Sequence, residues 1–346
     1  MFKYYGSSYI FTAIAIVLGY LIGGWPAVGI VLILGVLETS LSFDNAVVNA
    51  SVLKNWDEKW RKRFLVWGLP IAVFGMRLVF PLAIVAITTG LGPIESLQLA
   101  ANEPERYETI IKSVYHEIAA FGGVFLMMVF LDFFLQEEKE HHWIPFIEQP
   151  LSKLGRLGVQ AVVTLGVVLT ATAYMPEAQK LEFLIAGVWG LITYVLAQSV
   201  GTLATGGEDM GTKIIKQGAG GFLYLELLDA SFSFDGVIAA FALTNNIWIM
   251  MIGLAVGAFF VRSFTLHLVY KGTLAQYRYL EHGAFWAIGV LATIMFLHAV
   301  GIHVPELVTG GLGAVLIGCA LWSSIRANKA DSTGAELEAQ EKELQA

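Results

Sequence analysis

Apolar stretches of about 20 residues recur along most of this 346-residue chain. A stretch of that length spans the hydrocarbon core of a bilayer as a helix. Charged residues make up only 14% of the chain, against about 25% in soluble domains. The sequence therefore predicts an all-α, polytopic membrane protein. We expect about ten transmembrane helices, at 8–24, 27–50, 64–90, 113–135, 157–175, 181–203, 218–244, 247–270, 281–301 and 307–326.

Basic residues between these stretches predict the orientation, because cytoplasmic loops carry an excess of Lys and Arg. One set of alternate loops, together with the tail, holds most of the basic residues. The loops of the opposite side contain only Arg106, Lys112 and Lys180. We therefore expect both termini in the cytoplasm and a polar cytoplasmic tail at 327–346. No cleavage pattern follows the first apolar stretch, so we expect a membrane helix there and not a cleaved signal peptide.

An acidic motif occurs twice. The segment "LETSLSFDNAV" (37–47) aligns without a gap with "LDASFSFDGVI" (228–238). Two further markers recur in the same order: "GLPIAVFGMR" (68–77) resembles "GLAVGAFFVR" (253–262), and "HEIAAFGGV" (116–124) resembles "EHGAFWAIGV" (281–290). These recurrences predict two homologous halves of five helices, 1–175 and 176–326. Because five is odd, the second half would be inverted, as in many secondary transporters with a site at the repeat interface.

The predicted spans contain more acids than bases. A charged residue at the bilayer centre costs at least about 2.5–3.5 kcal/mol. The excess negative charge can be removed by protonation or by a bound cation, which is the chemistry of a proton-coupled cation transporter. The charged residues in predicted spans are the acids Glu38, Asp44, Glu226, Asp229 and Asp235 and the bases Arg77 and Arg262.

Helical spacing places Glu38, Ser42 and Asn45 on one face, and Asp229, Ser233 and Gly236 on another. Asp44 lies about 120° from Glu38 around an ideal helix, so it joins the same site only if the helix is locally broken or the site is wide. The serine-rich segments 39–42 and 231–233 favour such breaks, because Ser side chains compete for backbone hydrogen bonds.

The candidate ligands are all oxygens, which suit Mn²⁺, Ca²⁺ and Mg²⁺. Arg77 and Arg262 could balance the carboxylates when no ion is bound, or be static structural partners, and the motif serines Ser42 and Ser233 could assist gating or only bond neighbouring helices. The pairs His116–Glu117 and Glu281–His282 are candidates for a proton relay, or are interfacial residues near helix ends. The single cysteine excludes a disulfide framework, and the net charge of −7 gives no indication of nucleic-acid binding.

The two motifs, "LETSLSFDNAVVNA" and "LELLDASFSFDGVIAA", resemble the paired signatures of the TerC family of bacterial membrane proteins. The resemblance covers most of 25–326. It implies a multi-pass protein of the bacterial inner membrane related to exporters of Mn²⁺ or other divalent cations. The acidic family positions correspond to Glu38, Asp44 and Asn45 in the first half and to Glu226, Asp229 and Asp235 in the second. The family's second motif usually continues Asp-Ser-Ile-Pro, whereas this chain has Asp235-Gly236-Val237-Ile238.

Three functions follow as hypotheses. The first is a proton-coupled divalent-cation transporter, an exporter that works by alternating access of the two halves. The second is a non-transporting scaffold, in stress response or tellurium resistance, whose buried acids are structural. The third, an intramembrane haem enzyme, is disfavoured because no two histidines lie at a suitable spacing on one span. We therefore expect no enzymatic activity, no haem and no nucleotide.

Overall fold

Helices are the only regular elements in the part of the chain that the computed structural model describes, residues 2–136, 141–155, 158–203 and 218–345. Within these ranges, side chains are not described at 2–3, 200–203, 235, 306–307 and 332–345. The predicted all-α class is confirmed. The helices, in chain order, are α1 (Phe2–Leu41), α2 (Phe43–Leu53), α3 (Glu58–Pro70), the π-helix η1 (Ile71–Val79), α4 (Phe80–Thr89), α5 (Pro93–Asn102), α6 (Pro104–Ser113), α7 (Tyr115–Phe134), α8 (Pro145–Leu154), α9 (Gln160–Ala173), α10 (Glu177–Leu203), α11 (Gly218–Phe241), α12 (Ile247–Lys271), α13 (Thr273–Gln276), α14 (Leu280–Ala299) and α15 (Glu306–Gln345).

Seven helical segments among the described residues are long and apolar enough to cross a membrane. All ten predicted spans fall on helices, but two of them, 8–24 and 27–50, lie largely on the single segment Tyr4–Leu41. The predicted span at 157–175 corresponds to the shorter α9, and that at 218–244 to the acid-rich α11. The chain is thus a multi-pass membrane protein, while the count of ten and the inverted repeat stay predictions.

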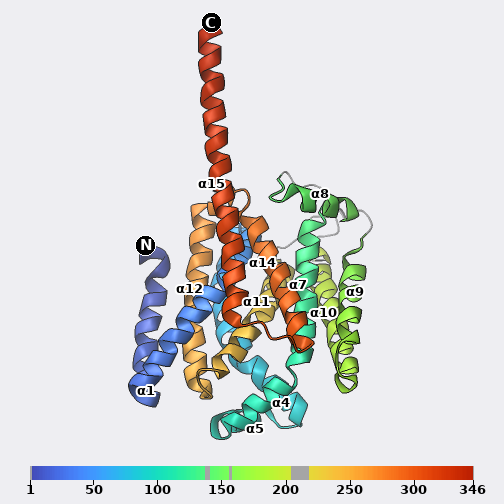
Figure 1. Cartoon of the computed structure of the whole chain (residues 1–346). Coiled ribbons are helices and arrows are strands. Elements are labelled where there is room, and N and C mark those ends of the chain that lie inside the picture. The colour runs from blue at the N-terminus through green and yellow to red at the C-terminus, as the bar shows by residue number, and fades with distance from the viewer. Residues whose placement is uncertain (1, 137–140, 156–157, 204–217, 346) are drawn as a thin grey trace.

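The bundle has inner and outer helices. About two thirds of the most apolar window is buried in α7, α12 and α14, against 22% to 28% in the windows of α1, α10 and α15. The outer helices expose large apolar side chains such as Leu21, Trp189 and Trp322. Helices with apolar residues all round and an unburied face are suited to lipid contact. In Figure 1 the α5 helix lies at one end of the bundle, and α15 projects from the other.

Helix α1 folds back on itself at two glycines. Gly24 has φ 66° and ψ −157°, a conformation that only glycine adopts readily, and Gly23 is also non-helical. Pro26 follows in the first turn of the second arm, where its missing N–H is tolerated. The first arm packs against α12, and the buried hydroxyls of Ser8 and Ser263 hydrogen bond at 2.7 Å. The second arm carries the first acidic motif into the bundle.

The predicted break in the first motif is confirmed at Ser42, which separates α1 from α2 with φ −97° and ψ 20°. Thr39 and Ser40 donate their hydroxyls to carbonyls four residues earlier, so side chains compete with the backbone there. The corresponding prediction for 231–233 is wrong, because α11 continues through the second motif. Ser231 bonds back to the Leu227 carbonyl within the helix, and residue 238 is Ile instead of a helix-breaking Pro.

The third broken region is η1, a π-helix between α3 and α4. Pro81 lacks the N–H that would bond the carbonyl of Arg77 four residues earlier. The guanidinium Nη1 of Arg77 donates to the Ala72 carbonyl at 2.6 Å, so the side chain satisfies a carbonyl of the widened helix. π-helical turns often occur at functional sites. Here the turn carries Arg77 into the bundle beside the first motif.

The predicted polar tail at 327–346 is helical as far as Gln345, because α15 continues into it without a break. Parts of the loops predicted at 136–156 and 204–217 lie outside the described residues.

Candidate ion-binding site

Two cavities reach the Ser42 break. The first, which we name the Glu226 cavity, has a volume of about 50 Å³ and lies between α2, α3, η1, α11 and α12. The second, which we name the Glu38 cavity, has a volume of about 690 Å³ and extends to the α14–α15 connection. Ser42 lines both cavities. The break in the helix therefore borders both cavities.

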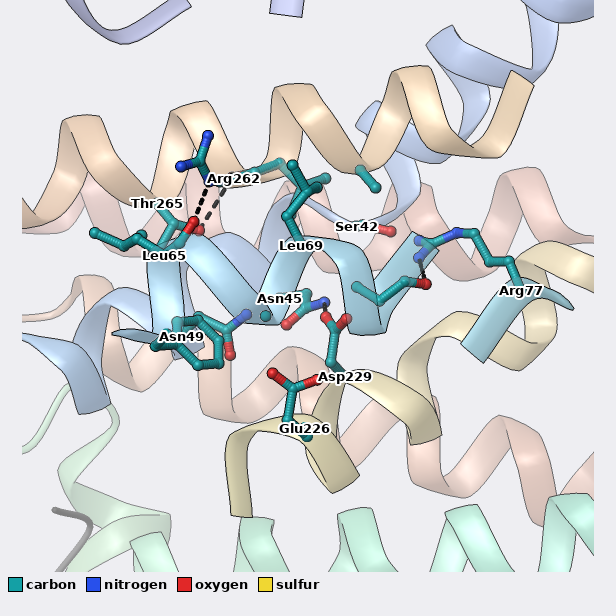
Figure 2. Close-up of a pocket in the computed structure, with 15 residues that line it drawn as sticks. Ser42, Asn45, Asn49, Leu65, Leu69, Arg77, Glu226, Asp229, Arg262 and Thr265 are labelled. Atoms are coloured by element: carbon teal, nitrogen blue, oxygen red, sulfur yellow. Dashed lines mark hydrogen bonds between the residues drawn. The ribbon is translucent and has the colours of Figure 1, made fainter. Parts of the chain in front are cut away.

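The Glu226 cavity brings the two acidic motifs together. Asn45 of α2 donates its amide Nδ2 to Asp229 Oδ1 of α11. Figure 2 shows Asn45 and Asp229 pointing toward each other, with Glu226 beside them. Glu226 is approached closely by α3, since a β-carbon placed on Gly68 would lie 3.0 Å from Glu226 Oε1. A glycine at position 68 therefore leaves room for the carboxylate.

Several acceptor oxygens in this cavity have no donor among the described residues. Both carboxylate oxygens of Glu226 are buried and unpartnered, and the same holds for Asn45 Oδ1 and Asn49 Oδ1. Buried polar atoms are almost always hydrogen bonded. Four acceptors without a protein donor therefore line one small cavity, where a proton, a water or a cation would satisfy them. A volume of about 50 Å³ accommodates one ion with few waters.

A buried ion pair lies at the break. Arg77 Nη2 pairs with Glu38 Oε1, and their side chains are 5% and 2% exposed. Ser42 Oγ donates to the same carboxylate oxygen at 3.1 Å. Glu38 fits because its neighbours are glycines: a β-carbon on Gly236 would lie 2.6 Å from Oε2, and one on Gly257 would overlap the Glu38 side chain. Glycine at position 236 thus makes space for Glu38.

The Glu38 cavity is lined by the two acids of the first motif. Glu38 and Asp44 both line it, so the Ser42 break brings them to a common cavity. Asp44 Oδ1 accepts the backbone N–H of Asn45 at 2.8 Å. Farther along the cavity, Tyr115 and His298 hydrogen bond at 3.0 Å. The first-half acids thus share one cavity, while Glu226 and Asp229 line the other.

The remaining predicted site residues are distributed more widely. Arg262 does not balance a carboxylate in the described contacts; its Nε donates to the Leu65 carbonyl at 2.8 Å. Ser233 is buried, its hydroxyl has no described partner, and it lines neither cavity. The side chain of Asp235 lies outside the described residues.

The two histidine–glutamate pairs do not line either cavity. His116 Nε2 is 3.6 Å from Glu182 Oε2, and His116 and Glu117 lie in the first turn of α7. Glu281 pairs with Lys54, and the Nε2 of His282 lies 2.9 Å from the His141 carbonyl. A relay joining these pairs to the central acids is not formed by the described contacts.

Sequence reasoning missed several residues that line the Glu226 cavity, among them Asn49 and Gly68. Asn49 follows Asn45 by four residues, so both lie on one face of α2, and that spacing was the available signal. Gly68 had no comparable signal, because its importance depends on which helix packs against α3.

Comparison with known proteins places the chain in a wider group. Residues 43–331 match the family described as "Protein of unknown function (DUF475)". The chain is also 33% identical over 82 residues to the uncharacterized membrane protein YceF of Bacillus subtilis (strain 168). That match covers 24% of this chain and 31% of YceF, so it spans less than a third of the relative. No solved structure matches the chain.

Proposed function

We propose that this chain, which belongs to the DUF475 family of unknown function, is a secondary transporter of divalent cations and not an enzyme. The observation that carries the proposal is the group of unpartnered oxygens in the Glu226 cavity. A buried carboxylate that keeps its charge without a protein donor is costly, and a proton or a cation at Glu226 would lower that cost. A resident static partner is absent from the described neighbours of Glu226.

The oxygen chemistry of the cavity favours hard divalent cations. Glu226 supplies two carboxylate oxygens, Asn45 and Asn49 supply amide oxygens, and Asp229 adds a second carboxylate. Mn²⁺ and Ca²⁺ take mixed carboxylate and amide oxygens, and Mg²⁺ is possible where waters complete its octahedron. Two carboxylates also match the charge of a divalent ion. Both motifs contribute, as expected for a site at the interface of two halves.

Proton coupling follows from the same carboxylates. An anionic carboxylate without a partner is costly to bury. A proton would therefore occupy Glu226 when the cation is absent, and the arriving cation would displace it. Such an exchange at one site makes proton antiport the natural coupling mode.

The two cavities support alternating access. Arg77 lines the Glu226 cavity, Glu38 lines the Glu38 cavity, and their ion pair lies between the two. Two unit charges 4 Å apart attract by about 4 kcal/mol at an effective dielectric constant of 20. A cation that competes for Glu38 would weaken this pair. We propose that the pair closes the path in the ion-free state and opens as the cation moves toward Asp44.

The direction of transport is proposed from the loop charges. The Glu226 cavity is lined by Leu65, which follows the basic segment 54–63 by two residues, and we expect that segment in the cytoplasm. The cation would then enter at the Glu226 cavity and leave through the larger Glu38 cavity. Export from the cytoplasm across a bacterial inner membrane agrees with the resemblance of the motifs to TerC proteins.

The test is cation flux in proteoliposomes. Purified protein is reconstituted, and uptake of radioactive Mn²⁺ and Ca²⁺ is measured with and without a pH gradient. We expect flux that depends on the gradient and is lost in Glu226→Gln and Asp229→Asn. The control Glu177→Gln changes an acid whose side chain is 89% exposed and should transport normally. Folded protein that shows no flux under any gradient, or flux unaffected by Glu226→Gln, would favour the scaffold hypothesis.

A further inference from the structure

A second cluster of potential metal ligands lies outside both cavities, where the first turn of α7 meets the first turns of α10. His116, Glu117 and Glu182 each offer a ligand atom, and these atoms lie within 4.8 Å of one another. Two carboxylates with one imidazole carry a charge of about −2 when the imidazole is neutral. Negative charge alone does not make a metal site, so the burial and the hydrogen bonding of the histidine are the deciding observations.

His116 is the buried member. Its side chain is 10% exposed, and its Nε2 has no hydrogen-bond partner among the described residues. Glu182 Oε2 is 3.6 Å from this nitrogen, which is beyond hydrogen-bond distance. Two ligands about 2.1 Å from one ion lie about 3.4 Å apart at a tetrahedral angle. The observed spacing therefore suits a shared ion better than a direct hydrogen bond.

The other half of the chain provides an internal contrast. The corresponding pair, Glu281–His282, also follows the start of its helix, but protein groups bind it. Glu281 pairs with Lys54, and His282 Nε2 lies near the His141 carbonyl and 3.5 Å from Glu148 Oε2. The His116–Glu117 pair has no such cation or carbonyl in its described contacts. A histidine and a glutamate are thus adjacent near the start of a helix in both halves, in reversed order, and protein groups partner them only at 281–282.

We propose that His116, Glu117 and Glu182 bind a first-row divalent transition ion that ties α7 to α10. An imidazole ligand suits Zn²⁺, Mn²⁺ or Co²⁺ and disfavours Mg²⁺ and Ca²⁺, which prefer oxygen. Glu182 is 58% exposed, so its side chain can rotate to complete the site as the ion enters from the aqueous boundary. This is a structural ion that stays bound, and it is separate from the transported cation of the Glu226 cavity.

Equilibrium dialysis of the full-length protein in detergent tests the proposal. The protein is stripped with a chelator and dialysed against buffered free Zn²⁺, and the bound Zn²⁺ per chain is counted. We expect one tight site in the wild type, with a Kd raised at least about tenfold in His116→Gln and in Glu182→Gln. Glu182→Gln changes an exposed residue, so folding should persist, which circular dichroism would verify.

Two further variants locate the bound ion. Glu177→Gln changes an exposed acid on the same helix and should keep the tight site. Glu226→Gln should also keep the tight site, because the Glu226 cavity is separate from it. This outcome does not depend on whether the protein transports cations. Tight Zn²⁺ binding that survives both His116→Gln and Glu182→Gln, or that is lost only in Glu226→Gln, would overturn the proposal. Absence of tight Zn²⁺ binding in the wild type would overturn it equally.

Discussion

The buried Arg77–Glu38 pair permits a quantitative prediction. Replacing Arg77 with Met leaves Glu38 as a carboxylate whose side chain is 2% exposed and whose remaining described donor is Ser42 Oγ. Breaking a buried pair on one side costs about 3–5 kcal/mol, because an uncompensated charge stays buried. The Ala72 carbonyl also loses its guanidinium donor, which adds about 1 kcal/mol. We expect Arg77→Met to lower the free energy of unfolding by about 4–6 kcal/mol.

The double variant separates charge from packing. Arg77→Met combined with Glu38→Gln removes both charges and keeps similar volumes. Replacing a buried pair by uncharged groups is often close to neutral, so we expect the double variant to be at least about 2 kcal/mol more stable than Arg77→Met alone. Denaturant titration in mixed micelles measures all four proteins of the cycle. Single costs that add to within about 0.5 kcal/mol would refute the coupling.

Three further changes test the packing around the sites. Gly68→Val places a β-carbon 3.0 Å from Glu226 Oε1, so cation flux should fall while the thermal midpoint changes little. Gly257→Leu would overlap the Glu38 side chain, so it should destabilise the protein by about 1–3 kcal/mol in denaturant titration. The buried Glu148 carboxylate accepts hydrogen bonds from two backbone N–H groups just before α8 and from an indole N–H of α14. Glu148→Gln removes the charge and weakens these hydrogen bonds. Limited proteolysis should then cut near α8 faster than in the wild type.

Much of the architecture was predictable because lipid imposes it. Twenty-residue apolar stretches have few alternatives to helices in a membrane, and the predicted spans fall on helices for that reason. The Ser42 break was also predictable, since the competing hydroxyls are local in sequence. The unbroken α11 was missed because similar serines bond back to the helix when no proline follows.

Long-range pairing was predictable only in part. Opposite charges in an apolar environment had to find partners, and Arg77 does pair with a motif acid, Glu38. Arg262 has the same sequence context, yet it donates to a backbone carbonyl. The difference depends on helix packing, which sequence spacing does not specify. For the same reason the division of the acids between two cavities, and the contact of His116 with Glu182, appear only in three dimensions.

Calorimetric titration of Mn²⁺ into purified protein tests the central claim most directly. The titration uses the Glu182→Gln variant, in which the proposed site at His116, Glu117 and Glu182 is weakened. The heat of Mn²⁺ binding then comes from the Glu226 cavity. We predict one bound Mn²⁺ per chain in that background. The binding heat should change with the ionisation enthalpy of the buffer, because the buffer takes up the released proton. Adding Glu226→Gln should raise the Kd at least about tenfold or abolish binding. An unchanged Mn²⁺ affinity after Glu226→Gln would contradict the account.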